Sequence, residues 1–278
     1  MPSVSTIPLE AHPFTIASVD SRYHLTSRAA MERMDSTAEL VDHRRLNGTA
    51  ESEELEFMIN VRYGFTKRLA EVAQSGRKLK VFVDGPYGFS PDVRNDDTVV
   101  LIAGGSGISL VHSMFLGVVS DVQKGKSRCR KVVFVWSVRD AQQLEWVSKT
   151  LSEALEVAPD QFEVSIRIFV TGRGTLPSGT HPKGRDDASM YSESELHTAG
   201  SVRRPLHSFP AVRITQGRPD LGKLLKSEIS NTTGRMSVTV CGSQAIAKAC
   251  RDALRIPFTS TMYGGPSIVL HVESFGYA

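Results

Sequence analysis

Val99–Phe115 reads VVLIAGGSGISLVHSMF, and this stretch fits either a membrane span or a strand that turns into a helix. A membrane helix needs about 20 mostly apolar residues, and the apolar character here continues as far as Val119. Three glycines and a serine interrupt it between Gly104 and Gly107, and these are poor helix formers. Apolar residues precede them as a short run and follow them at helical spacing, so the stretch predicts strand, glycine turn and helix.

Such a unit is typical of phosphate binding. Glycines at the end of a buried strand let the backbone approach a pyrophosphate, and the N–H groups of the following helix attract its charge. Gly105-Ser106-Gly107 is followed by Leu110 where the common dinucleotide fingerprint has a third glycine. The pattern is therefore a variant of that fingerprint, and it indicates dinucleotide binding only if it lies inside an α/β domain.

The surrounding sequence supplies that domain. Strands are predicted at Lys131–Trp136, Phe162–Val170, Met236–Cys241 and Ile268–Glu273, and helices at Gln142–Val157, Asp220–Ile229 and Gln244–Arg255. Alternating strands and helices predict a doubly wound parallel sheet, which binds ligands beyond the carboxyl ends of its strands.

The loop after the second strand of this series bears on the choice of nucleotide. It reads SVRD and places Arg139 beside Asp140. An arginine there can hold the 2′-phosphate of NADP, whereas an acidic residue favours the free ribose of NAD. We therefore favour NADPH, with Asp140 either neutralising Arg139 or capping the next helix.

The region before this domain has a different character. Strands are predicted at His12–Val19, Phe57–Arg62 and Lys78–Gly88, with a helix at Thr66–Ala73. Two polar segments, at about 21–56 and 172–210, predict surface insertions that are at least partly disordered. We therefore expect a β-rich domain over residues 1–90 and a nucleotide-binding domain over residues 96–278.

Composition excludes several classes of protein. The 278 residues are 40% hydrophobic and carry a net charge of +3, which suits a globular protein and does not suggest a nucleic-acid partner. Three cysteines without metal-ligand spacing point to a reducing compartment, and no residue is assigned to a metal. The first residues have neither the basic nor the apolar region of a signal peptide.

Eight motifs now fall in one order along the chain. They are HPFTIAS, GFTKRL, VDGPYG, AGGSGIS, VWSVRD, GRPDL, VCGS and HVESFGYA. In this order and spacing the sequence resembles the cytosolic half of the fungal ferric-chelate reductases, membrane flavocytochromes distantly related to the NADPH oxidases. The resemblance implies an α/β, ferredoxin-reductase-like fold: part of an FAD-binding antiparallel β-barrel, followed by the doubly wound NADPH-binding domain.

The resemblance also implies which residues bind the cofactors. Those implied for FAD are His12, Pro13, Phe14, Thr15, Gly64 and Thr66, and those for the NADPH pyrophosphate are Gly104, Gly105, Ser106, Gly107 and Ile108.

Six further positions follow from the same resemblance. Arg139 is implied at the ribose phosphate, Arg218 at the nucleotide, and Cys241 with Gly242 at the nicotinamide. Phe275 matches the aromatic residue that covers the flavin, and Glu273 of the same motif is a further contributor. Thr15, Cys241 and Phe275 are thus expected nearest to the reacting atoms.

The implied activity is hydride transfer from NADPH to FAD, with electrons passing on to membrane haems and then to ferric iron outside the cell. In the family a haem domain and the first barrel strands precede HPFT, so we expect this chain to be an incomplete reductase. It would have no transmembrane segment of its own and would work at the cytosolic side of the plasma membrane with a membrane haem domain. The alternatives are a superoxide-forming NADPH oxidase module and a truncated, non-catalytic nucleotide-binding remnant.

Overall fold

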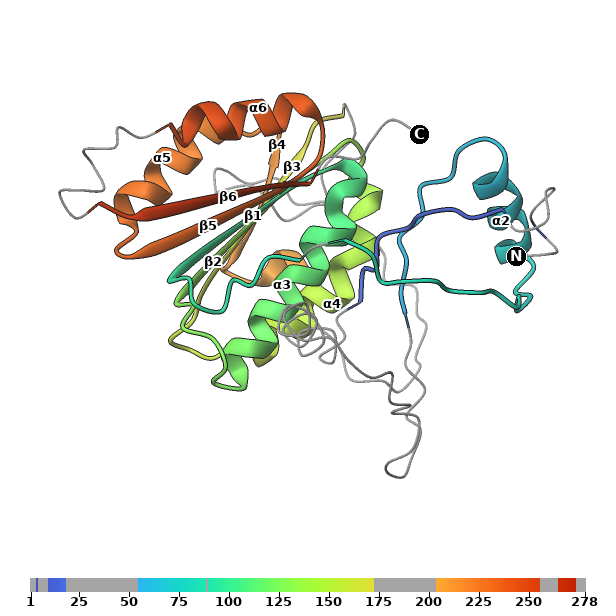
Figure 1. Ribbon diagram of the computed structural model, residues 1–278, viewed down its shortest axis with the longest axis horizontal. Helices are drawn as coiled ribbons and strands as arrows, with labels where there is room; N and C mark the ends of the chain where they lie inside the picture. The colour runs from blue at the N-terminus through green and yellow to red at the C-terminus, as the bar shows by residue number, and fades with distance from the viewer. Residues whose placement is uncertain are drawn as a thin grey trace, which may run out of the picture.

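The computed structural model describes residues 4, 10–18, 55–88, 90–172, 204–255 and 265–273. Its main body is a six-stranded parallel sheet in the order β4-β3-β2-β1-β5-β6, covered by two helices on each face (Figure 1). The strands are β1 (Thr98–Gly104), β2 (Lys131–Val138), β3 (Glu163–Val170), β4 (Val212–Gln216), β5 (Arg235–Cys241) and β6 (Ser267–Glu273). The helices are α2 (Phe65–Gln74), α3 (Ile108–Gln123), α4 (Glu145–Val157), α5 (Leu221–Asn231) and α6 (Gln244–Ala253), with short 3-10 turns at Gly105–Gly107, Ala141–Leu144 and Leu206–Ser208.

β1 lies inside the sheet, and its side chains divide between two cores. Val99 and Leu101 pack with residues of α3 and α4, whereas Val100 and Ile102 pack with residues of α5 and α6. Successive strand residues point to opposite faces, so a strand covered on both sides must be apolar throughout. The continuous apolar run that precedes the glycines thus follows from its central place.

α3 is the helix whose sequence could be mistaken for a membrane span. Gly105–Gln123 is long and apolar enough to cross a membrane, yet 56% of its apolar 18-residue stretch is buried inside the protein. The stripe Ile108, Val111, Phe115 and Val118 is buried against the sheet. The predicted strand, glycine turn and helix are therefore confirmed.

The order of the strands reverses beside β1. From β1 the chain adds β2, β3 and β4 on one side, then crosses back to place β5 and β6 on the other. The loops after β1 and β5 thus leave the sheet as neighbours that turn toward opposite faces. This reversal is the place where open parallel sheets bind ligands.

β4 was absent from the predicted elements, since only Ile214 in this short edge strand is buried. The predicted insertion over 172–210 also extends too far. The described chain resumes at residue 204 with a 3-10 turn, where Leu206 and Phe209 are buried. Residues 173–203 of this insertion lie outside the described residues, as do residues 21–54 of the first one.

The region before the sheet departs most from prediction. α2 confirms the predicted helix, but Lys78–Gly88 forms no strand, and Ile16 and Phe57 make a single antiparallel bridge. A strand is stable only where its backbone groups pair with a neighbouring strand. Among the described residues Lys78–Gly88 has no such neighbour, and without one even the large apolar side chain of Phe82 is 96% exposed. The strand predicted at Lys78–Gly88 is wrong in this structure. Apart from that isolated bridge, the described residues show only parallel pairing, so the FAD barrel stays a prediction.

Candidate functional site

The turns after β1 and β5 pack backbone against backbone. A Cβ atom on Gly107 would overlap the carbonyl group of Cys241, and one on Gly242 would come within 3.1 Å of the Gly104 nitrogen. No side chain larger than hydrogen fits between these turns without moving one of them. The sequence-predicted residues Gly104, Gly107, Cys241 and Gly242 are therefore brought together at the reversal of strand order.

The other face of the first turn is open. Gly105 has φ 54°, and a Cβ atom placed on it would meet nothing within 4 Å. Gly105 and Ser106 are exposed, and the first N–H groups of the turn that leads into α3 have no acceptor within the helix. Trp136, fully buried at the end of β2, donates its indole N–H to the Gly105 carbonyl at 3.1 Å. A rigid turn with outward N–H groups can bind a phosphate.

Two arginines follow strands whose carboxyl ends lie on the same side of the sheet. Arg139 follows β2 and Arg218 follows β4, and both are exposed. Asp140 accepts a hydrogen bond from the Gln142 backbone N–H at 2.9 Å and thereby caps the next helical turn. Asp140 therefore has a structural role, and among the described residues no ion pair joins its carboxylate to Arg139.

Cys241 lies at the end of β5, fully buried. Burial, together with the charge of Glu273 beside it in β6, raises the pKa of the Cys241 thiol to about 12. The thiol is therefore neutral at physiological pH. Phe275 lies outside the described residues.

The HPFT motif forms an aromatic cluster with the start of α2. The rings of His12 and Phe65 stack with 3.9 Å between centroids, and Phe14 lies 6.3 Å from Phe65 and 6.5 Å from Phe57. His12 also pairs with Glu10 at 3.0 Å. Two predicted flavin motifs that are far apart in sequence are thus adjacent in space.

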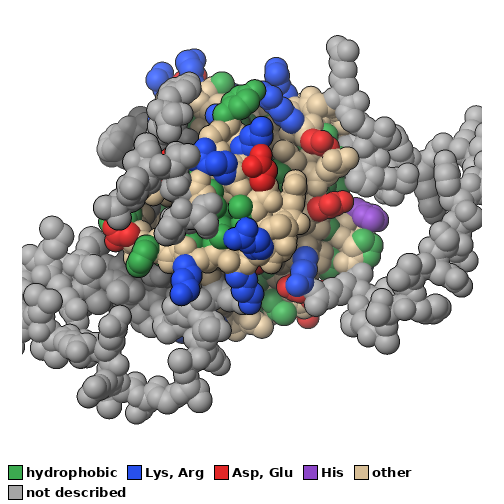
Figure 2. Space-filling model, turned by 90° about the vertical axis from the view of Figure 1, so that its right-hand side faces the viewer, with side chains coloured by type: hydrophobic (Ala, Val, Ile, Leu, Met, Phe, Trp, Pro, Cys, Tyr) green, Lys and Arg blue, Asp and Glu red, His purple; other side chains and the backbone are tan. Residues whose placement is uncertain are grey.

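The start of α2 has the features of a second anion site. Gly64 precedes the helix with φ 74° and has nothing within 4 Å of a Cβ position, while the Thr66 hydroxyl accepts from the Arg62 N–H at 2.8 Å. Basic side chains gather on the face that carries this helix (Figure 2). The segment 55–88 itself carries six basic residues, Arg62, Lys67, Arg68, Arg77, Lys78 and Lys80, against three acidic ones, Glu56, Glu71 and Asp84. This charge favours anionic ligands.

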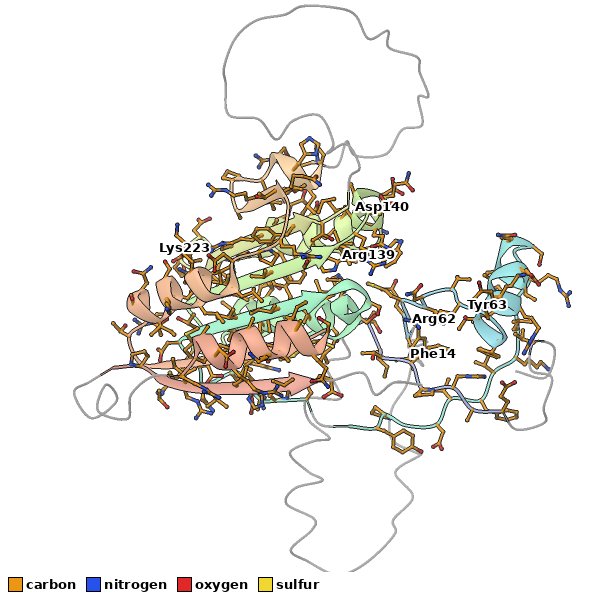
Figure 3. The ribbon with its side chains drawn as sticks, turned by 90° about the horizontal axis from the view of Figure 1, so that it is seen from above. Phe14, Arg62, Tyr63, Arg139, Asp140 and Lys223 are labelled. Carbon is orange, nitrogen blue, oxygen red and sulfur yellow. The ribbon has the colours of Figure 1, made fainter. Side chains whose placement is uncertain are left out.

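The parallel sheet and the part of the chain that contains the HPFT motif and α2 face each other. The carboxyl ends of the strands point toward the part that contains α2, and Arg139 lies on that side of the sheet, facing the group of Phe14, Arg62 and Tyr63 (Figures 1 and 3). His112 and Ser113 of α3 bond the carbonyl groups of residues 17 and 18, which end the HPFTIAS motif. Sequence reasoning missed His112, Ser113 and Trp136. For His112 and Ser113, the available signal was a polar residue within an otherwise apolar helix.

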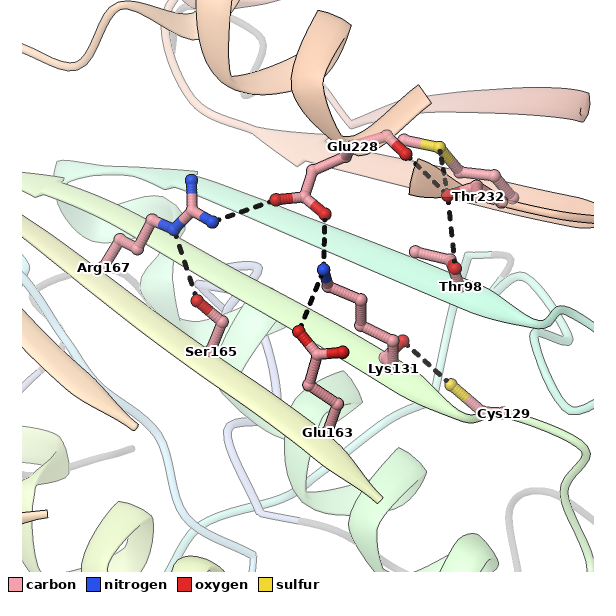
Figure 4. A network of polar contacts seen from close by, with 9 residues as sticks. Thr98, Cys129, Lys131, Glu163, Ser165, Arg167, Glu228 and Thr232 are labelled. Carbon is pink, nitrogen blue, oxygen red and sulfur yellow. Dashed lines mark hydrogen bonds and ion pairs between the residues drawn. The ribbon is translucent and has the colours of Figure 1, made fainter. Parts of the chain in front are cut away.

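A polar network lies at the amino ends of the strands, on the side of the sheet away from the glycine turns (Figure 4). Glu228 of α5 is 2% exposed and pairs with Lys131 and Arg167, each at 2.9 Å, while Lys131 also pairs with Glu163 at 2.9 Å. Lys131 and Glu163 begin their strands, so this network lies away from the glycine turns and ties α5 to the sheet. Within the described ranges, no group of three or more histidine, cysteine or acidic side chains could hold a metal.

A glycine turn between a buried strand and a helix, at the reversal of strand order in a parallel sheet, defines a dinucleotide-binding domain. The sequence profile of the ferric reductase NAD binding domain matches residues 96–254, the part of the chain that carries these features. The chain therefore belongs to the ferric reductase family, as its motifs predicted.

Individual relatives support this membership over most of the chain. Ferric reductase transmembrane component 5 of Saccharomyces cerevisiae is 27% identical over 233 residues, which cover 83% of this chain and 31% of that protein. Ferric reductase transmembrane component 1 of Schizosaccharomyces pombe is 26% identical over 269 residues, which cover 91% of this chain and 43% of that protein. The matched region thus spans less than half of either relative.

Proposed function

We propose that this chain is the electron-input module of a ferric-chelate reductase. In this proposal it binds NADPH and FAD side by side, so that hydride passes from NADPH to FAD and electrons continue toward a haem domain and ferric iron. The observation that carries the proposal is the contact between α3, which begins at the nucleotide turn, and the end of the HPFTIAS motif.

The residues around the carboxyl end of β1 fit NADPH. Gly105 and Ser106 are exposed at the start of a helix, as a pyrophosphate requires. Arg139 and Arg218 are positive groups at the same edge, and Arg139 has no ion pair or hydrogen bond from its guanidinium to the described residues. An arginine at the end of the second strand suits a 2′-phosphate, so NADPH is favoured over NADH.

The residues around α2 fit the phosphates and ring of FAD. Gly64 and the first turn of α2 offer backbone N–H groups among basic side chains, and Thr66 provides a hydroxyl at that turn. Phe14 and Thr15 are half-buried beside them and are suited to line a planar ring. Thr15, Cys241 and Phe275 remain the residues proposed nearest to the reacting atoms.

When bound, the nicotinamide and the flavin supply the hydride donor and acceptor, and the flavin can release electrons singly. The protein has to hold both rings in contact and keep water out. The neutral, buried Cys241 thiol suits this role because it adds no charge beside a nicotinamide. No acid–base pair is required for such a transfer, and none is assigned.

The test is to mix the purified chain anaerobically with FAD and then with NADPH or NADH, following the loss of the visible absorbance of oxidised flavin. We expect faster loss with NADPH. Arg139→Ala should remove that preference, while Arg251→Ala, an exposed arginine on α6, should keep it. Nucleotide binding without flavin reduction would favour the non-catalytic remnant. Superoxide formation in place of ferric chelate reduction, when the module is joined to a haem domain, would favour the oxidase.

A further inference from the structure

We propose that His112 is a positioning residue for hydride transfer, because its ring joins the flavin motif, the nucleotide-binding helix and α4 through two hydrogen bonds. Resting on the proposed function, the proposal names the contact that sets the distance between the two cofactor sites. His112 is fully buried in α3; its Nδ1 lies 3.2 Å from the Ala17 carbonyl oxygen and its Nε2 lies 2.6 Å from the Thr150 hydroxyl.

The partners decide the protonation of the ring. The Ala17 carbonyl oxygen can only accept, so Nδ1 must carry a proton and donate it. In the neutral ring Nε2 then has no proton, so it accepts the single proton of the Thr150 hydroxyl at 2.6 Å, in preference to the Val147 carbonyl oxygen 3.1 Å from that hydroxyl. Burial lowers the pKa of His112 to about 4, which keeps this neutral form at physiological pH. The ring is therefore held in one tautomer and one orientation.

Ala17 is held on both sides. Its carbonyl accepts from His112, its N–H donates to the Glu56 carbonyl at 2.8 Å, and its side chain is fully buried. The next residue is fixed in the same way, because the Ser113 hydroxyl donates to the Ser18 carbonyl at 3.0 Å. Two adjacent residues of α3 thus hold two adjacent residues of the motif.

These contacts lie close to both proposed sites. Thr15 is two residues before Ala17, about 7 Å along an extended chain. Ile108 begins α3 four residues before His112, about 6 Å along a helix. Any shift of the motif on α3 therefore moves the flavin residues relative to the nucleotide turn, and hydride transfer is sensitive to displacements on the order of 1 Å.

A matched pair of substitutions separates the two ends of the ring. His112→Asn places an amide N–H near the position of Nδ1, so it can keep the bond to Ala17 and lose the one to Thr150. His112→Gln reaches the position of Nε2 and loses the bond to Ala17. Thr150→Val and Ser113→Ala provide independent variants in which the histidine is intact, and His207→Gln, at an exposed histidine, is the control.

The first readout is hydrogen exchange of peptides from residues 10–18, which needs no cofactor. We expect about tenfold faster exchange in His112→Gln and Ser113→Ala, and less than about threefold in His112→Asn, Thr150→Val and the control. The second readout is flavin reduction at saturating NADPH. It should slow about tenfold in His112→Gln, while the dissociation constants of FAD and NADP⁺ change less than about twofold, since His112 is proposed to touch neither.

Equal exchange and equal rates in the asparagine and glutamine variants would overturn the proposal, as would a slower rate explained by weaker cofactor binding. Should the wild-type chain fail to reduce flavin while the variants differ in exchange as expected, the proposed function fails and the role in hydride transfer falls with it, but the anchoring of the motif stands.

Discussion

Acid should destabilise this protein through His112 in a way that can be calculated. The pKa of His112 is lowered to about 4 in the folded protein by burial, against an ordinary value of 6.5. As the pH falls below 6.5, the unfolded chain takes up the proton first, so stability is lost between pH 6.5 and 4 and the loss is complete below about pH 4. Between pH 7.5 and 5 the relative population of the unfolded state rises about thirtyfold, or about 2 kcal/mol.

The assay is urea unfolding of the wild-type protein and of His112→Asn at pH 7.5 and pH 5. Other groups also titrate in this range, so the useful quantity is the loss in the wild type minus the loss in the variant. We expect a difference of about 2 kcal/mol, or about 1 M in the urea midpoint for an m value of about 2 kcal/mol/M.

His207→Gln serves as the control because this exposed histidine should leave the acid loss of the wild type intact. Equal losses in the wild type and in His112→Asn, within about 0.5 kcal/mol, would refute the burial of a neutral ring as the cause of the acid sensitivity.

Four other substitutions test the contacts of the sheet and of the glycine turn. Glu228→Ala should cost about 3 kcal/mol in thermal or urea unfolding because it removes the buried carboxylate that pairs with the partly exposed Lys131 and Arg167, whereas Glu163→Ala, at a side chain 63% exposed, should cost less than about 1 kcal/mol. Gly107→Ala should push the first turn away from the Cys241 carbonyl and abolish nucleotide binding by calorimetry; unchanged affinity would contradict the close approach. Trp136→Phe keeps an aromatic ring but loses the indole N–H that bonds the glycine turn, so NADP⁺ should bind about fivefold more weakly with the fold intact by circular dichroism.

The elements of the nucleotide-binding domain were predictable because each shows its periodicity locally. The run before the glycines of β1 and the stripe of α3 follow directly from which faces are covered. The Asp140 carboxylate is a different case. Its two alternatives, neutralising the arginine or capping a helix, depend on where the next backbone N–H lies, and the structure shows the cap.

The β-rich part before the sheet could not be predicted in the same way. Lys78–Gly88 alternates like a strand, but a strand is defined by a partner that sequence periodicity does not name. β4 escaped prediction for the converse reason, since an edge strand buries little and so carries little apolar signal.

By itself the sequence determined the parallel sheet, the glycine turn and the family motifs, because these depend on residue types at short, fixed spacings. Tertiary structure alone decided that Gly107 meets Cys241, that Trp136 supports the glycine turn, and that His112 holds Ala17. Each of these contacts joins residues far apart in the chain, and their meeting depends on strand order and helix packing. No local pattern contains that information.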